Sequence, residues 1–447
     1  MPCTTAIYRA YGLRVLASRV TCLSTSVTSS GLKALGSKRD VSTASSLRAW
    51  PRINSQPTGL TCKPQDGTFS LIHIPLSLYP VFLQPILQVL LPNGEFDSGK
   101  EIEGLSIDNK HGFLNVSITP VECSVVCHDN WAKKVFEPVI RRLPRDASKT
   151  VTISKDSYLI LSVISAGMNA GTGVMELTSP LALAGIPIFF ITTYYSDFIL
   201  VPTKDRQTVV QALLCRGFEF SEDESAFVSP TVHVRGGSVS SQPPSTPPPS
   251  NVAELQTRTF ELLKKRDVVP YIEEGLTVVL CSGKDLEQEQ LNHFSRRPTP
   301  TRRATGNGTN GGHARRSWLD NVDTKLYTSL ISVLVLQPRF LSMTLAQEDP
   351  PSLLLDKTQL SVFGDSLVGD VEGDLVPIFL DLENLPIEAT GIVSGVAGRL
   401  VAEMRMNETG DGEQLSYLST ARAGAVILSS EQSLKALEVM KPLLSKE

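Results

Sequence analysis

The chain has 447 residues, which is too long for one small hydrophobic core, and at ~150 residues per domain it predicts about two to four units. Lysine and arginine total 42 and aspartate and glutamate 46. The net charge of -4 therefore gives no electrostatic reason to expect nucleic acid or an anionic membrane as a partner. No apolar run reaches the ~20 residues of a membrane-spanning helix, and we expect a soluble protein.

The first 65 residues differ in composition from the rest. Arginine and lysine are spread among serine and threonine, and no acidic residue precedes Asp40. This composition is typical of a mitochondrial transit peptide, and residues 8–20 can form a basic amphipathic helix. A disordered extension explains the composition equally well. Under both alternatives, residues 1–65 lie outside the folded core.

From Phe69 onward, short apolar strands and amphipathic helices follow one another in the order β-α-β-β-α. This order predicts a first unit at residues 66–150 and a second at 151–234, whose strand YLILSVIS leads through AGMNAGTG into a helix and then IPIFFITTYYSDFILVP. A weaker copy occupies residues 373–447, where VPIFLDLEN precedes GIVSGVAGRLVAEM and LSYLSTARAGAVILS. One fold unit has been used more than once.

A proline- and serine-rich stretch separates the two halves and predicts a disordered linker at residues 235–270. A third unit, residues 271–372, contains a basic insertion at 284–317 that we also expect to be disordered. A solvated loop explains this insertion, and phosphorylation is the alternative, because RRAT and RRS within it resemble basophilic kinase sites. The fold class is therefore α+β, with tandem ferredoxin-like units of β-α-β-β-α-β order in two halves.

Motifs for catalysis are missing from the sequence, which has no G-x-S-x-G, H-E-x-x-H or G-x-x-x-x-G-K-[ST] pattern. We expect a protein that is not an enzyme. Cys123, Cys127 and His128 form a loose cluster without further ligands at a workable spacing, so alternating strand positions explain them better than a metal site. The seven cysteines are predicted to be reduced, and no cofactor is expected.

Two turns carry candidate binding residues. Gly167, Gly171 and Gly173 lie between a strand and a helix, where free backbone N–H groups can hold a carboxylate, although a tight turn without a ligand explains them as well. Gly391 opens a helix at the corresponding place in the last unit. The second turn, Tyr194–Asp197, fits either a β-turn or a contact surface with exposed tyrosines beside an acid.

The segments AGIPIFFITTYYSDFILVP, SVISAGMNAGTG, ATGIVSGVAGRL and LSTARAGAVIL resemble the CASTOR family of ACT-domain proteins, which are cytosolic arginine sensors of TOR signalling. The resemblance covers roughly residues 69–442. It implies four ACT domains, a nutrient-sensing role without catalysis and a cytoplasmic location. The basic leader keeps a mitochondrial location open as the alternative.

The resemblance also implies site residues. An amino acid would lie between the second and fourth units, and the matching positions are Pro187, Ile188, Gly391, Ile392, Thr420, Ala421 and Gly424. Gly424 stands where the family has an aspartate that pairs with the ligand's cationic group, and Ala421 stands where it has a covering phenylalanine. An amino acid other than arginine is therefore plausible.

A protein partner, a regulatory complex of the TOR pathway, would contact Tyr194, Tyr195 and Asp197. A homodimer is a further possibility. Two other functions remain open. One is a regulatory subunit or degenerate relative of an amino-acid biosynthetic enzyme such as aspartate kinase, whose ACT pairs are similar. The other is an interaction module that holds no ligand between the second and fourth units.

Overall fold

The computed structural model describes seven stretches of the chain. They are residues 60–91, 112–165, 170–220, 249–284, 323–347, 349–404 and 415–445. All of them belong to one compact unit, Arg52–Glu447. Residues 1–59 of the predicted leader, most of the Pro/Ser-rich stretch and all but the first residue of the basic insertion lie outside these ranges.

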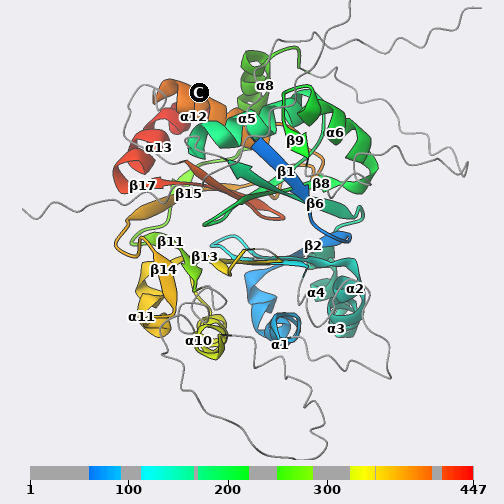
Figure 1. Cartoon of the computed structure of the whole chain (residues 1–447), viewed down its shortest axis with the longest axis vertical. Helices are drawn as coiled ribbons and strands as arrows, with labels where there is room; N and C mark the ends of the chain where they lie inside the picture. Colours follow the sequence, from blue (N-terminus) through cyan, green and yellow to red (C-terminus); the bar gives the residue numbers. More distant parts are fainter. Residues whose placement is uncertain are drawn as a thin grey trace, which may run out of the picture. The chain divides into compact units, whose positions relative to one another are not determined.

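Two β-sheets form the centre of this unit (Figure 1). The first sheet contains, in spatial order, β2 (Phe69–Ile74), β4 (Cys123–His128), β3 (Phe113–Ile118), β12 (Leu341–Ala346), β13 (Ser352–Asp356) and β11 (Val278–Gly283). The second contains β6 (Tyr158–Ser165), β8 (Asp197–Pro202), β7 (Phe189–Thr192), β16 (Ser416–Ser419), β17 (Ala423–Ser429) and β15 (Leu375–Asp381). The sheets meet at two corners, where Phe69 pairs with Tyr158 and Val278 with Leu375, so the strands close into a barrel-like ring.

Shorter strands extend the ring. They are β1 (Leu60–Pro64) on β6, β9 (Glu219–Phe220) on β1, β5 (Thr152–Ile153) on β2, β10 (Tyr271–Ile272) on β15 and β14 (Leu367–Gly369) on β11.

Helices cover the outer face of each sheet (Figure 1). Those on the first sheet are α1 (Tyr79–Leu90), α2 (Asp129–Trp131), the π-helix η2 (Ala132–Phe136), α3 (Glu137–Arg142), α4 (Arg145–Thr150), α10 (Thr324–Val335) and α11 (Leu360–Phe363). Those on the second are α5 (Ala170–Leu183), α6 (Arg206–Leu214), α8 (Val252–Lys265), α12 (Ile392–Glu403) and α13 (Ser430–Leu444). Single 3-10 turns occur at η1 (Leu76–Leu78), η3 (Thr203–Asp205) and η6 (Lys357–Gln359). No helix of the described stretches is long and apolar enough to cross a membrane.

Three hydrophobic layers hold the unit together. One lies between the sheets and includes Phe69, Phe113 and Phe379, and the others lie between each sheet and its helices. Both faces of a strand are therefore buried: Val125 faces the helices and Val126 faces the opposite sheet. This double burial explains why the strands are continuous apolar runs rather than alternating ones.

The chain is a mixed α/β protein in which β-α-β-β recurs in sequence order, beginning at β2, β6, β11 and β15. Strands from different repeats pair with one another, β3 with β12 and β7 with β16. The sheets are thus shared between distant parts of the chain, and the division into four domains remains a prediction.

The folded unit includes the last residues of the predicted N-terminal extension, residues 1–65. β1 lies within it and pairs along its length with β6, and Cys62 is fully buried. The basic, serine-rich composition of the preceding residues concealed this short strand. The segment can be recognised as a strand only from its pairing with β6.

Helix α8 lies within the predicted disordered linker, residues 235–270, so this range is not disordered throughout. The Asn251 side chain accepts a hydrogen bond from the backbone N–H of Glu254, which caps the helix. Leu255, Phe260 and Leu263 are buried at helical spacing. The amphipathic pattern was present in the sequence, but the neighbouring prolines dominated the composition.

Candidate functional site

A seam between two distant segments runs where β7 meets β16. Ile191 pairs with Leu418, and the N–H of Phe190 donates to Ser419 Oγ at 3.0 Å. The N–H of Tyr417 donates to Thr192 Oγ1 at 2.9 Å. Each strand thus uses backbone groups that would otherwise form an exposed sheet edge. The second sheet is continuous across the seam.

Helices α5 and α12 pack together above this seam, and the hydroxyls of Ser179 and Ser394 lie 2.8 Å apart. Small residues on α12 allow close approach of its neighbours. A Cβ at Gly395 would lie 2.4 Å from Thr259 Oγ1 on α8. Glycine at this helical position is therefore explained by packing.

A cavity of about 60 Å³ opens at one end of the seam. Its walls come from β7, the loop between β15 and α12, the start of α12, and the turn between β16 and β17. The lining residues are Ile188, Phe189, Leu382, Leu385, Pro386, Ile387, Ala389, Gly391, Ile392, Val393, Tyr417, Ser419, Thr420, Ala421 and Ala423. None of these has an acidic or basic side chain. A water needs ~10–15 Å³ on this measure, so the cavity suits only a compact molecule.

The N-terminus of α12 faces the cavity. Gly391, the N-cap residue, has a left-handed backbone with φ +83°, and no side chain caps the helix. Thr259 Oγ1 donates to the Gly391 carbonyl at 3.1 Å, and a Cβ at this glycine would lie 2.5 Å from Leu255 Cδ1. The first backbone N–H groups of an α-helix have no partner within the helix and carry partial positive charge. One wall of the cavity is therefore suited to an anionic group.

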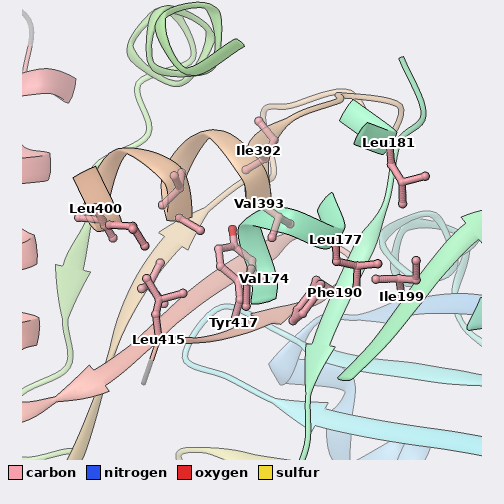
Figure 2. Close-up of a cluster of buried hydrophobic side chains, with 14 of the residues drawn as sticks. Val174, Leu177, Leu181, Phe190, Ile199, Ile392, Val393, Leu400, Leu415 and Tyr417 are labelled. Carbon is pink, nitrogen blue, oxygen red and sulfur yellow. The ribbon is translucent and has the colours of Figure 1, made fainter. Parts of the chain in front are cut away.

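Tyr417 also lines the cavity, and its hydroxyl is buried on the helix side of the sheet. Its side chain is 1 % exposed, and its hydroxyl has no hydrogen-bond partner in the protein. Figure 2 shows the ring rising from β16 beside Val174 and Val393, with its oxygen toward the helices. Burial raises the pKa of this phenol, so it is a neutral donor. An unpaired buried hydroxyl costs about 1–3 kcal/mol, which marks it as a group with an unmet interaction.

The floor of the cavity rests on Glu122, which lies between β3 and β4 in the first sheet and is fully buried. Thr420 Oγ1 donates to its Oε1 at 2.6 Å, and the backbone N–H of Arg422 donates to the same oxygen. Oε2 lies 2.5 Å from His73 Nδ1. The N–H of Ala421 donates to Ser124 Oγ at 3.2 Å. The first sheet thereby holds the turn that lines the cavity.

The structure brings together most of the predicted ligand-binding residues. Ile188, Gly391, Ile392, Thr420 and Ala421 line the cavity. Two others do not. Pro187 precedes the lining residues of β7, and Gly424 packs under the Tyr417 ring, where a Cβ would lie 2.6 Å from the hydroxyl.

The predicted glycine turn is not at this cavity. Gly171 and Gly173 lie within α5 rather than before it, and neither lines the cavity. Gly167 lies outside the described residues. No sequence pattern singles out Tyr417, whereas Glu122 could have been noticed as the one acid in an apolar hairpin.

The predicted partner surface, Tyr194 to Asp197, is only partly exposed. Tyr194 and Tyr195 are 37 % and 49 % exposed, and their rings meet edge to face at 4.8 Å. The N–H of Tyr194 donates to Ser352 Oγ of β13 at 2.8 Å, which fixes the turn against the first sheet. Asp197 is not an exposed acid. Burial raises the pKa of its carboxyl to about 7, and a hydrogen bond from Thr192 offsets part of the increase.

The cysteine cluster has no metal-binding geometry: in the described parts of the chain, no group of three or more His, Cys, Asp or Glu is placed to hold a metal ion. Cys123 and Cys127 are buried in β4 on the helix side. Burial raises the pKa of both thiols. They are core residues.

Comparison with protein families identifies an ACT domain at residues 153–214, the segment from β6 to α6 that includes β7. No curated protein matches the chain. An ACT domain suggests a regulatory, amino-acid-binding role. The matched domain contains β7, which is one of the two strands that meet at the seam.

Solved structures give weak global matches. Atu0741 from Agrobacterium tumefaciens has 18 % identity over 36 % of this chain and 92 % of its own, with a TM-score of 0.23. Aspartate kinase from Synechocystis has 9 % identity over 87 % of this chain and a TM-score of 0.27, and the chain spans 56 % of that enzyme. VC0802 from Vibrio cholerae, described as a possible transport protein, has 15 % identity over 36 % of this chain and 91 % of its own, with a TM-score of 0.21.

Proposed function

We propose that this chain is a non-catalytic regulatory protein that binds a small amino acid at the seam between its ACT domain and the segment from β15 to α13. The observation that carries the proposal is the cavity at the N-terminus of α12, walled on its other side by the start of β7 in the ACT domain. The carboxylate of an amino acid would accept hydrogen bonds from the first turn of α12, whose dipole also favours an anion there.

We also propose that the cavity does not catalyse a reaction. The lining residues of the cavity include no histidine, cysteine, lysine or carboxylate that could serve as a general base or an activated nucleophile. Ser419 and Thr420 are hydroxyls, but Thr420 donates to the Glu122 carboxylate. Binding without turnover is the chemistry that these residues support.

The finer assignment is a nutrient sensor of the CASTOR type, with four ACT units, acting in the cytoplasm on a regulatory complex of TOR signalling. The exposed ring of Tyr195 and the half-exposed ring of Tyr194 are suited to a protein contact. The turn that bears them follows β7 directly, so the strand that begins at the cavity ends at this surface. Ligand binding at the start of β7 would then alter the protein-contact surface at its end.

Thermal-shift measurement of the full chain with each of the twenty amino acids tests ligand binding. An amino acid present at 100 times its Kd should add about 2.7 kcal/mol of apparent stability. Ala389→Trp, which fills the cavity, should abolish the shift, whereas Ala253→Trp on the exposed face of α8 should preserve it. Absence of a shift with every amino acid would reject the proposal.

The partner surface needs a separate test. Tyr195→Ala should reduce co-purification of the TOR regulatory complex from cell extract, while Leu434→Ala, an exposed apolar residue on α13, should leave it unchanged. Equal recovery with wild type and Tyr195→Ala would reject this surface and leave the ligand site untouched.

A further inference from the structure

A second cavity, of about 290 Å³, lies at the first sheet, near the end where β3 meets β12. Its walls come from the turn between β2 and α1, the turn between β3 and β4, the turn between β10 and β11, and the residues that lead into β12. Small-molecule sites have volumes of ~300–1,000 Å³. This cavity is therefore close to the size of such a site and much larger than the cavity at the seam.

The two cavities occupy equivalent places in the β-α-β-β repeat. The walls of the cavity at the seam come from the loop before α12, the turn between β16 and β17, and the start of β7. The corresponding elements at the first sheet are the turn before α1, the turn between β3 and β4, and the segment before β12. Their linings differ in charge: the cavity at the seam has no charged side chain, whereas the second cavity has a guanidinium and a carboxylate.

Arg339 brings the positive charge, and its guanidinium is held in one place. Nε and Nη2 donate to Asp356 Oδ2 at 3.3 and 3.1 Å. Nη1 donates to the Glu274 carbonyl at 3.4 Å, and Nη2 donates to the Gly275 carbonyl at 3.1 Å. Of the five N–H groups of a guanidinium, one on Nη1 thus remains for an acceptor from outside the protein. The side chain is 46 % exposed, so a ligand can reach it.

Glu273 brings the negative charge to the same cavity. The residue is half-buried, and its carboxylate has no ion pair with a cation of the described residues. Arg339 cannot collapse onto it, because Asp356 and two backbone carbonyls hold the guanidinium. The cavity therefore presents two opposite charges that are both partly exposed and do not pair with each other.

The rest of the lining is mostly apolar. Its apolar residues are Leu76, Ile118, Pro120 and Pro338. Two polar groups in the wall already have acceptors: the Tyr79 hydroxyl donates to the Leu334 carbonyl at 2.7 Å, and Thr119 Oγ1 donates to the Glu122 carbonyl at 3.2 Å. A molecule that matches this lining has a positive group, a negative group and an apolar body.

We propose that this cavity is a second ligand site, which binds a free amino acid with a large apolar side chain, of the class of leucine, methionine and phenylalanine. The ammonium group of the ligand pairs with Glu273, and its carboxylate accepts a charge-assisted hydrogen bond from Nη1 of Arg339. The apolar side chain packs against the wall that contains Leu76 and Ile118. This site is separate from the cavity at the seam and does not depend on the function proposed for that cavity.

Calorimetric titration of the full chain with leucine, methionine and phenylalanine tests the site. Ala389→Trp provides the background, because it fills the cavity at the seam and leaves the second cavity open. Leucine should bind equally well to wild type and Ala389→Trp. Isocaproate and isoamylamine have the leucine side chain but only one of its two charges. Each should bind at least about 10-fold more weakly than leucine, because each lacks one bond to a charged group.

Glu273→Gln in the Ala389→Trp background should weaken leucine binding about 10-fold. Glu274→Gln is the matched control, because this neighbouring residue is exposed and does not line the cavity. Since the Glu273 carboxylate has no ion pair in the described parts of the chain, Glu273→Gln should keep the Tm of its background. The measured loss of affinity then reports on the ligand and not on folding.

Four results would overturn the second site: no binding of any of the three amino acids, loss of leucine binding in Ala389→Trp, equal effects of Glu273→Gln and Glu274→Gln, or isoamylamine binding as tightly as leucine. Failure of the function proposed for the cavity at the seam gives a different result. In that case Ala389→Trp changes the binding of no amino acid, while Glu273→Gln still weakens the binding of leucine.

Discussion

At the scale of single residues, Glu122 joins the floor of the cavity to the first sheet. Its carboxylate lies in the first sheet, and two of its donors belong to the turn between β16 and β17 in the second. A buried carboxylate is stable only while its partners remain. The position of Thr420 in the cavity floor therefore depends on a residue almost 300 positions away.

Glu122→Ala should lower the free energy of unfolding by about 3 kcal/mol, because the Arg422 N–H loses its acceptor and Thr420 keeps only the Ala423 carbonyl at 3.1 Å. Glu122→Gln keeps an acceptor oxygen and should cost about 1 kcal/mol. Urea unfolding of the full chain measures both, with Glu383→Ala on an exposed loop as the control. Equal midpoints for Glu122→Ala and Glu383→Ala would contradict the role given to the carboxylate.

Asp197 gives a prediction about pH. Its folded-state pKa of about 7 lies above the ordinary value of 3.8, so the folded state keeps a proton that the unfolded state has released. The contribution of this group to stability is therefore present below about pH 4 and is lost as pH rises toward 7. Asp197→Asn should be more stable than wild type at pH 8, and the difference should shrink as pH falls to 4. Urea unfolding across this range checks the sign, and a difference that grows in acid would contradict it.

At the scale of elements, sequence patterns found most of the core strands but not their partners. The apolar runs at β3, β4, β6 and β17 are long enough to be recognised alone. β7 and β16 have four residues each, and nothing in either predicts that they pair. The cavity residues Ile188 and Gly391 lie next to recognisable motifs and could be predicted from the sequence. Glu122 stands out as the one acid of an apolar hairpin, but its role does not, because its bonds to Thr420 and Arg422 form only once distant strands meet.

Helix packing at α12 can be tested with a matched pair of glycines. A Cβ at Gly395 would collide with Thr259 of α8, whereas a Cβ at Gly173 in α5 would have no atom of the described residues within 4 Å. Gly395→Ala should therefore destabilise the protein by about 1–3 kcal/mol through overpacking. Gly173→Ala should be neutral or stabilising by up to about 1 kcal/mol, since alanine favours helix. Comparable losses in the two variants, measured by thermal unfolding, would contradict the close α8–α12 packing at Gly395.

At the scale of the whole compact unit, two sheets share one interior layer and each has helices on its outer face (Figure 1). The cavity lies in the second sheet, but its floor is held by the first through Glu122 and Ser124. The turn with Tyr194 is likewise fixed to the first sheet through Ser352. A ligand in the cavity would therefore affect contacts between the sheets and not only those within one of them.

Hydrogen exchange of the full chain, with and without the amino acid that gives the largest thermal shift, tests the location of the site most directly. The first turn of α12, the turn between β16 and β17, and the start of β7 should exchange more slowly when the ligand is bound, because their N–H groups surround it. Ala389→Trp should show no such protection. Protection confined to segments away from the cavity would show that the amino acid binds elsewhere and would contradict this account.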